Sequence, residues 1–185
     1  MFKQIANYLY NKQIKKKQVV VDNIRQKELK PFKNVKSFLL LFDASTEENY
    51  QLIHSIVNDL KDANKIVRTI GYVPWKHAPH YCLTKLSWDF ITSKNIHFTG
   101  IPKVQFVEEV ILENFDVLID FTTEEIKPLQ YIASLSMAKL KVTSVQSNNK
   151  IFDFVIADKT FTYKKFFNEF KLYLDMFTNE KNECL

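Results

Sequence analysis

Glycine and cysteine are both scarce in this chain of 185 residues, which contains two of each. Few glycines leave few places where the backbone can approach a phosphate closely, which argues against a glycine-rich nucleotide loop. The phosphate-loop pattern G-x-x-x-x-G-K-[ST] and the serine-nucleophile pattern G-x-S-x-G are both absent. Cys82 and Cys184 make no disulfide framework, so a reduced, cytoplasmic setting is expected.

Long hydrophobic runs are missing as well. The longest run, Phe38–Phe42, is far too short to span a bilayer. The N-terminus has neither an apolar stretch of signal-peptide length nor a small-residue cleavage site, so no secretory signal is expected. Hydrophobic residues nevertheless make up 46% of the chain, and 16 of them are Phe, which is enough for the core of one folded domain.

Positive charge is concentrated at the start of the chain. The first 36 residues hold ten cations and only two acids, Asp22 and Glu28, whereas the remaining 149 residues hold 16 cations and 19 acids. The segment is therefore +8 and the rest −3. Such a basic arm on a mildly acidic body is typical of a chain that binds a polyanion. The predicted RNA-binding residues are Lys3, Lys12, Lys15, Lys16, Lys17, Arg25, Lys27, Lys30 and Lys33.

Apolar patterns from residue 35 onward alternate between strand-like and helix-like segments. Strands are predicted at 35–42, 66–73, 88–91, 96–98, 117–121, 140–145 and 151–156, and a closing helix at 161–177. The alternation predicts one α/β domain over 35–178, a three-layer, Rossmann-like, mostly parallel sheet with helices on both faces. Residues 1–34 are predicted to be a basic helical extension, and 179–185 a frayed tail.

The two clearest strands both end in an acid, Asp43 and Asp120. Ligands of open α/β sheets collect at the carboxyl ends of strands, so these two residues form a candidate ligand site for a metal or a ribose. The alternative is that each acid starts a turn or caps a helix. Asp43 is followed by Ser45 and Thr46, either of which could cap the next helix.

A second cluster is His77-x-x-His80-x-Cys82. Imidazole and thiol are zinc ligands, but a structural zinc site usually needs four ligands in paired spacing, and no second pair is present. The surrounding aromatic loop favours packing on the sheet over stacking on bases. No metal and no cofactor are predicted.

Residues 116–142 resemble a segment of the acceptor domain of lipopolysaccharide heptosyltransferases, in which a strand ending in Asp leads to a helix and a turn containing Ala138-Lys139. Taken whole, the chain resembles a Bacteroidetes-type family of uncharacterised short basic proteins, through its basic N-terminal helix, Phe42-Asp43 and the strand 116–120. The second resemblance permits an accessory protein of the ribosome.

These observations predict a non-enzymatic, RNA-associated protein that contacts rRNA, the ribosome or ribosomal proteins through its basic arm. Two alternatives stay open. One is a degenerate sugar- or nucleotide-binding α/β protein that uses Asp43 and Asp120. The other is a protein that binds an anionic membrane surface through the same arm.

Overall fold

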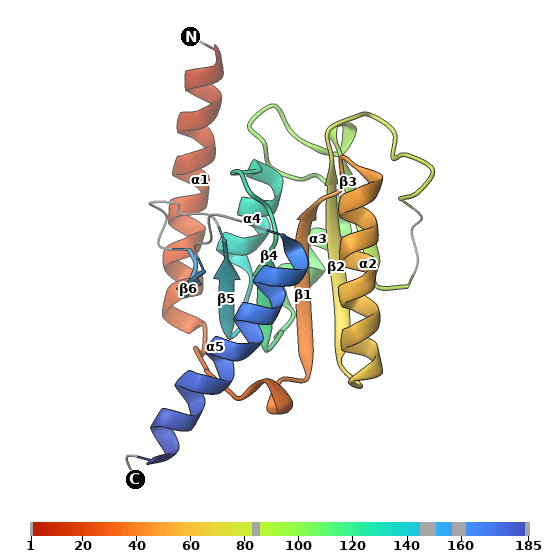
Figure 1. Ribbon diagram of the computed structural model, residues 1–185. Coiled ribbons are helices and arrows are strands. Elements are labelled where there is room, and N and C mark those ends of the chain that lie inside the picture. The colour runs from red at the N-terminus through yellow and green to blue at the C-terminus, as the bar shows by residue number, and fades with distance from the viewer. Residues whose placement is uncertain (1, 83–85, 145–150, 157–161, 184–185) are drawn as a thin grey trace.

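Six parallel strands form one sheet at the centre of the protein. The computed structural model describes residues 2–82, 86–144, 151–156 and 162–183. The strand order is β3-β2-β1-β4-β5-β6 (Figure 1). The bounds are β1 Ser37–Asp43, β2 Ile66–Val73, β3 Trp88–Thr92, β4 Val117–Asp120, β5 Leu140–Thr143 and β6 Phe154–Val155. This arrangement confirms the predicted Rossmann-like α/β class, and the sheet is wholly parallel.

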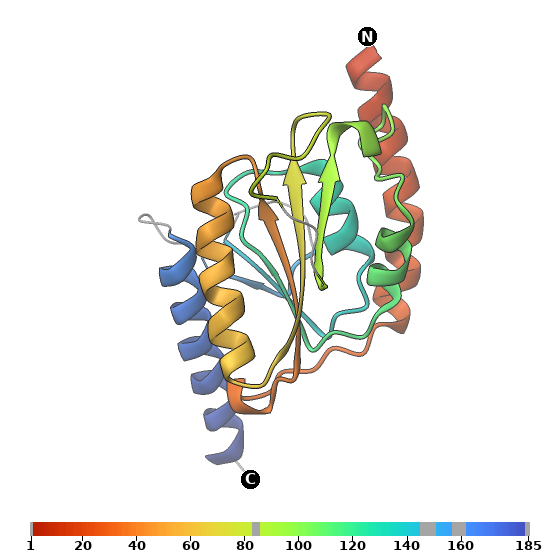
Figure 2. The same cartoon turned by 90° about the vertical axis from the view of Figure 1, so that its right-hand side faces the viewer.

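Helices cover both faces of the sheet. They are α1 Phe2–Ile24, α2 Glu47–Asp62, α3 Gln105–Leu112, α4 Lys127–Leu135 and α5 Tyr163–Glu183, with the 3-10 turns η1 Phe32–Asn34 and η2 Ser93–Asn95. Figure 2 shows α2 and α5 on one face and α3 and α4 on the other, with α1 outermost beside them. The predicted three layers are therefore present, and α1 adds to the outside of one of them.

The buried strands explain why both faces are covered. In β1 the side chains of Phe38, Leu40 and Phe42 join the core beneath α2 and α5. The alternating residues Leu39 and Leu41 join the opposite core beneath α3 and α4. A strand with apolar residues at every position cannot expose either face to water without cost, which favours a central place in a doubly covered sheet.

Helix α2 begins where the sequence predicts. The side-chain oxygen of Thr46 accepts a hydrogen bond from the backbone N–H of Asn49, so Thr46 is the N-cap. Glu47 and Glu48 occupy the first turn, where negative charge is favoured. This short connection leaves β1 directly beside the start of a helix.

The basic N-terminal helix is packed against the body. Its residues Tyr10 and Ile14 are buried in the core on the α4 side of the sheet, and the Tyr10 hydroxyl donates to the Lys127 carbonyl at 2.7 Å. Every residue of α4 from Pro128 to Leu135 is buried as a result, because α4 lies between the sheet and α1. Helix α1 ends at Ile24, so the helix stops short of the end of the helical extension predicted over 1–34, and residues 25–36 run on to β1 through the η1 turn.

Three segments differ from the sequence-based expectation. The strand predicted at 96–98 is wrong, because Ile96 makes only an isolated bridge to Pro102 after the η2 turn. The last strand is two residues long instead of six. Helix α5 continues to Glu183, so the tail expected from 179 is helical up to that residue. Within the described part of the chain, no helix has the length and apolar content needed to cross a bilayer.

Candidate functional site

The carboxyl edge of the sheet holds the two aspartates that the sequence singles out. Asp43 ends β1 and Asp120 ends β4, and these are neighbouring strands at the centre of the sheet. The chain leaves β1 toward β2 on one side and returns to β4 on the other, so this is the point at which the strand order reverses. Ligands of doubly wound sheets bind in the crevice at such a point.

The register places three polar side chains on one face of this edge. Asp43 pairs with Tyr72 of β2, and Leu41 pairs with Asp120 of β4. Side chains alternate along a strand, so Asp43, Tyr72 and Asp120 share the face that α3 and α4 cover. The sequence predicts the two aspartates at one edge, and the pairing adds Tyr72 to them.

Both aspartates accept hydrogen bonds within the turn that follows their strand, as expected if each acid starts a turn. Asp43 accepts hydrogen bonds from the Ser45 backbone N–H and hydroxyl, each at 2.9 Å. The Oδ1 atom of Asp120 accepts from the Thr122 backbone N–H at 3.0 Å. Both carboxylate oxygens of Asp43 accept hydrogen bonds, whereas Oδ2 of Asp120 is buried and has no hydrogen-bond partner among the described residues.

Burial controls the electrostatics of this edge. Asp120 is 1% exposed, and its burial raises the pKa of the carboxyl group to about 7. Burial also raises the pKa of Tyr163, at the start of α5, and the negative charges of Asp43 and Asp120 add to that effect. The pKa of Tyr72 is raised by burial and then by Asp43. Two carboxyl groups and two phenols are thus close enough to influence one another.

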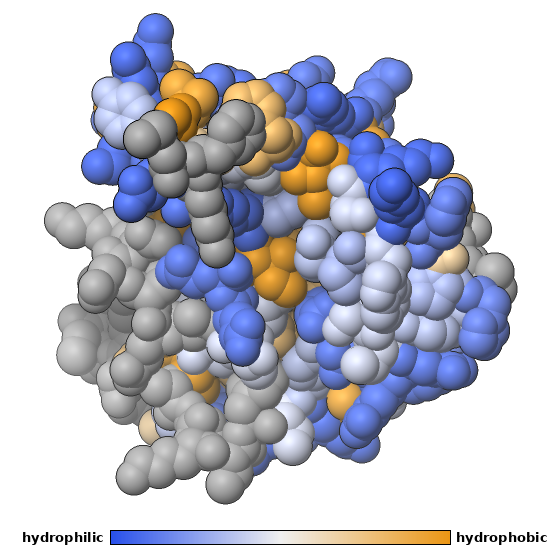
Figure 3. Space-filling model, turned by 90° about the horizontal axis from the view of Figure 1, so that it is seen from above, coloured by the Kyte–Doolittle hydropathy of each residue, from blue (hydrophilic) through white to orange (hydrophobic). Residues whose placement is uncertain are grey.

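A hollow of about 400 Å³ lies on the α4 side of this edge, and of the two carboxyl groups and two phenols only Tyr72 lines it. Its walls come from the end of β2, the loop after β3 and the start of α4: Tyr72, Ile96, Gly100, Glu125, Ile126, Lys127 and Pro128. Figure 3 looks down on this edge and shows a depression with hydrophobic side chains inside it and hydrophilic side chains around it. The volume is within the range of small-molecule sites.

One wall of the hollow is supported by α1. The Lys127 ammonium group contacts the side-chain oxygen of Asn7 and lies 5.5 Å from the centre of the Tyr10 ring. Gly100 packs against the same lysine: it has a φ of +99°, and a Cβ atom there would lie 2.9 Å from Lys127 Cδ. A residue other than glycine would therefore be strained and would push into this wall.

The chemistry of the edge favours hydrogen-bond donors over phosphates. The turn from β1 to α2, residues 43–46, contains no glycine, and the first turn of α2 carries Glu47 and Glu48. These acids occupy the place where a dinucleotide-binding fold holds its pyrophosphate. Together with Asp43 and Asp120 they make the edge acidic, which suits hydroxyl or amino groups.

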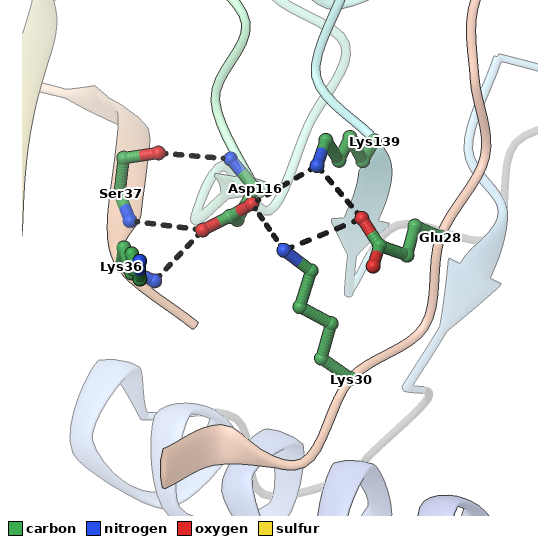
Figure 4. A network of polar contacts seen from close by, with 6 residues as sticks. All are labelled: Glu28, Lys30, Lys36, Ser37, Asp116 and Lys139. Atoms are coloured by element: carbon green, nitrogen blue, oxygen red, sulfur yellow. Dashed lines mark hydrogen bonds and ion pairs between the residues drawn. The ribbon is translucent and has the colours of Figure 1, made fainter. Parts of the chain in front are cut away.

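The opposite, amino edge of the sheet is a network of paired charges (Figure 4). Asp116, just before β4, accepts hydrogen bonds from the backbone N–H groups of Lys36 and Ser37 and from the Lys30 ammonium group at 2.9 Å. Lys139 reaches Glu28 at 2.7 Å. Beside this network, Arg25 binds Asp153 through two hydrogen bonds of 2.7 Å, and Lys27 approaches the same carboxylate at 2.8 Å.

The predicted RNA-binding residues therefore divide into two groups. Arg25 is buried, and Arg25, Lys27 and Lys30 are paired with carboxylates of the body. Lys17 is exposed but lies 5.8 Å from the centre of the Tyr131 ring. The exposed cations with no carboxylate partner among the described residues are Lys12, Lys15, Lys16, Lys17 and Lys33, and of these Lys17 contacts Tyr131; the side chain of Lys3 lies outside the described part. An RNA partner stays a prediction, with fewer cations open to it.

Sequence reasoning missed one buried cation. Lys141 of β5 is 1% exposed and donates to the Ser134 carbonyl at 3.3 Å, and its burial lowers the pKa to about 7. The sequence did contain an indication that this lysine is buried, because it stands between Leu140 and Val142 in a strand predicted to be covered on both faces. Tyr72 and Tyr163 were missed as members of the carboxyl edge because a tyrosine in a strand or helix carries no local sign of a polar site.

The His77, His80 and Cys82 cluster forms no site. Cys82 is buried, and burial raises the pKa of its thiol to about 11, whereas His77 and His80 are exposed. Across the residues that the structure describes, no three His, Cys, Asp or Glu side chains come together as metal ligands do. The loop instead sends Tyr81 inward, where its hydroxyl donates to the Ala44 carbonyl at 3.4 Å.

Comparison with known proteins identifies the chain at family level. The model of a family of unknown function, DUF6913, matches residues 5–177. The match runs from α1 to α5, so it includes the basic helix as well as the sheet and both of its edges. No curated protein and no solved structure gives a significant match.

Proposed function

Since the chain belongs to DUF6913, a family of unknown function, its role is inferred from its own residues, and we propose that it binds a neutral sugar or nucleoside at the carboxyl edge of its sheet. The observation that carries this proposal is the buried Oδ2 atom of Asp120, at the point where the strand order reverses, which has no hydrogen-bond partner among the described residues. A ligand hydroxyl would supply the missing bond.

The free-energy cost of burying an oxygen without a hydrogen-bond partner favours a ligand-binding role for Asp120 over a purely structural one. A buried polar atom without a partner costs about 1–3 kcal/mol, and native proteins keep few of them. In the turn, Oδ1 of Asp120 accepts the hydrogen bond from the Thr122 backbone N–H. The Thr122 hydroxyl lies beside the same carboxyl group and also has no hydrogen-bond partner among the described residues, so two buried polar groups here are available to a ligand. Strain or missing bonds of this kind are typical of functional sites.

The proposed ligand class follows from the surroundings. Acidic residues in the first turn of α2 would repel a pyrophosphate at the position where this kind of fold usually binds one. The part of the ligand that lies near α2 is therefore neutral. Vicinal hydroxyls, which sugars and nucleosides share, match two carboxyl groups with phenols nearby: Tyr72 lies near Asp43, and Tyr163 lies near both Asp43 and Asp120. Because Asp120 is covered in the free protein, the ligand has to displace the side chains above it.

The test is the thermal unfolding of the full chain with panels of monosaccharides and of nucleosides, one compound at a time. We expect a member of one panel to raise the unfolding temperature of the wild type and to leave that of Asp120→Asn unchanged. Asp62→Asn, at the exposed end of α2, is the matched control and should respond as the wild type does. An equal response of wild type and Asp120→Asn, or none from either panel at millimolar concentration, would refute the proposal.

A further inference from the structure

The outer face of α1 is a surface that the proposed ligand site does not use. We define it by Ile5, Tyr8, Lys12, Lys15, Lys16, Val19 and Val20, which lie within an arc of roughly 140° at 3.6 residues per turn. The four apolar members are each more than half exposed, and the three lysines are exposed without a carboxylate partner among the described residues. Asp22 is the only acid in the whole helix.

This face is not an ordinary solvated surface. A helix packed on one side normally presents polar residues on the other. In α1 the inner side already buries Ala6, Tyr10 and Ile14, yet the outer side carries a second set of apolar residues. A helix with apolar side chains on both sides is expected to be covered on both sides.

We propose that this outer face binds an anionic membrane surface, with α1 lying flat in the headgroup region. Lysine stems and aliphatic side chains interleave along it, and a bilayer with anionic lipids accepts both: the apolar groups enter the acyl boundary while the ammonium groups reach the phosphates. Nucleic acid would bind the lysines but would leave Ile5, Val19 and Val20 without a partner.

A second copy of the chain fits this surface less well. The three lysines lie near the middle of α1, so a twofold pairing of outer faces, parallel or antiparallel, sets lysines against lysines. The position of the helix suits a membrane instead. Figures 1 and 2 show α1 on the flank of the body, with its N-terminal end projecting beyond the carboxyl edge of the sheet. The seven residues that define the outer face are all exposed.

The test is flotation of the full chain with vesicles of phosphatidylcholine alone and of phosphatidylcholine with phosphatidylglycerol. We expect binding to the anionic vesicles only. Replacing Lys12, Lys15 and Lys16 together by Gln should weaken it roughly 100-fold, since each basic residue near an anionic surface contributes about fivefold. The matched control replaces Lys61, Lys94 and Lys103 by Gln, which makes the same change of net charge at exposed positions of the body and should leave binding nearly intact.

A second variant separates a membrane from RNA. Val19→Ser with Val20→Ser removes exposed apolar groups and no charge, so it should reduce vesicle binding by tenfold or more if these side chains enter the acyl boundary. Circular dichroism would verify that each variant keeps its fold. Failure to bind anionic vesicles would overturn the inference. So would tight binding of polyuridine that depends on the three lysines and not on the two valines.

Discussion

The two edges of the sheet differ in whether their carboxyl groups are paired with cations. At the amino edge each carboxylate of the network meets a cation: Asp116 meets Lys30, Asp153 meets Arg25 and Lys27, and Glu28 meets Lys139. At the carboxyl edge Asp120 is buried, one of its oxygens has no hydrogen-bond partner within the described part of the chain, and the groups beside it are Thr122 and Tyr163. Ion pairs such as those at the amino edge hold a segment in place, whereas an unpaired polar atom such as that at the carboxyl edge is typical of a binding site.

The pKa values record the same contrast. Burial pushes the pKa of Asp116 and of Asp153 upward, but their hydrogen bonds to lysine and arginine outweigh it and leave both below the usual value. Burial raises the pKa of Asp120 to about 7, and the Thr122 backbone N–H and the nearby Thr122 hydroxyl offset only part of that rise. Charged acids therefore stabilise the fold at one edge, and a neutral acid is favoured at the other.

The largest expected effect comes from breaking the amino edge. Arg25→Ala removes the buried partner of Asp153 and should lower the free energy of unfolding by about 3 kcal/mol, because a buried charge pair that loses one member leaves the other desolvated. Urea denaturation measures this loss. Lys27→Ala is the control, since Lys27 binds the same carboxylate from a side chain that is 63% exposed, and it should cost less than about 1 kcal/mol. Equal losses would show that the Arg25 pair has no special structural role.

The carboxyl edge can be tested by pH. An acid whose pKa is higher in the folded than in the unfolded protein favours folding while it is protonated, and this stability is lost as the pH rises from about 4 to about 7. Asp120→Asn removes that loss. The difference in unfolding free energy between variant and wild type should therefore grow by about 2–3 kcal/mol in favour of the variant between pH 5 and pH 8.

Two features make this measurement specific. Lys141, whose pKa is lowered to about 7, titrates in the same window but is present in both proteins, so its contribution cancels in the difference. Asp116 and Asp153 have lowered pKa values, so their stability is present above pH 4 and is lost only at lower pH. A difference that does not change between pH 5 and pH 8 would mean that the Asp120 carboxyl group is not neutral in the folded protein.

The smallest effect concerns the wall of the hollow. Gly100→Ala places a Cβ atom at a φ of +99° and within 2.9 Å of Lys127, so it should lower the free energy of unfolding by about 1–2 kcal/mol. It should also weaken any ligand that raises the unfolding temperature of the wild type, because Lys127 lines the hollow. Thermal unfolding with and without that ligand measures both effects. A stable variant with unchanged ligand response would separate the hollow from the site of Asp120.

Local patterns predict much of the fold and half of the site. Continuous apolar runs identify β1 and β4, and parallel strands bring their last residues, Asp43 and Asp120, to one edge. A polar residue followed by acids locates the start of α2 at Thr46. These strands and this helix start depend on residues that are neighbours in the sequence, so the sequence alone is enough to predict them.

The remainder depends on contacts between distant parts of the chain. Nothing near Arg25 indicates that Asp153 will neutralise it, so the arginine is indistinguishable from a free cation of the basic segment. Tyr72 joins the carboxyl edge only through the β1–β2 register. The extent of β6 and the docking of α1 on α4 are likewise set by tertiary packing, which overrides local propensity.

The docking of α1 also sets an order of events during synthesis. Tyr10 contacts Lys127, 117 residues later, and Arg25 contacts Asp153, 128 residues later. At roughly 5–20 residues per second, the ribosome needs about 6–25 seconds to make the partner of Tyr10 after Tyr10 itself. During that interval the inner face of α1 has nothing in the chain to cover it. Helix α1 is thus translated well before the residues that cover it, and for those seconds it is open to a chaperone on both of its faces.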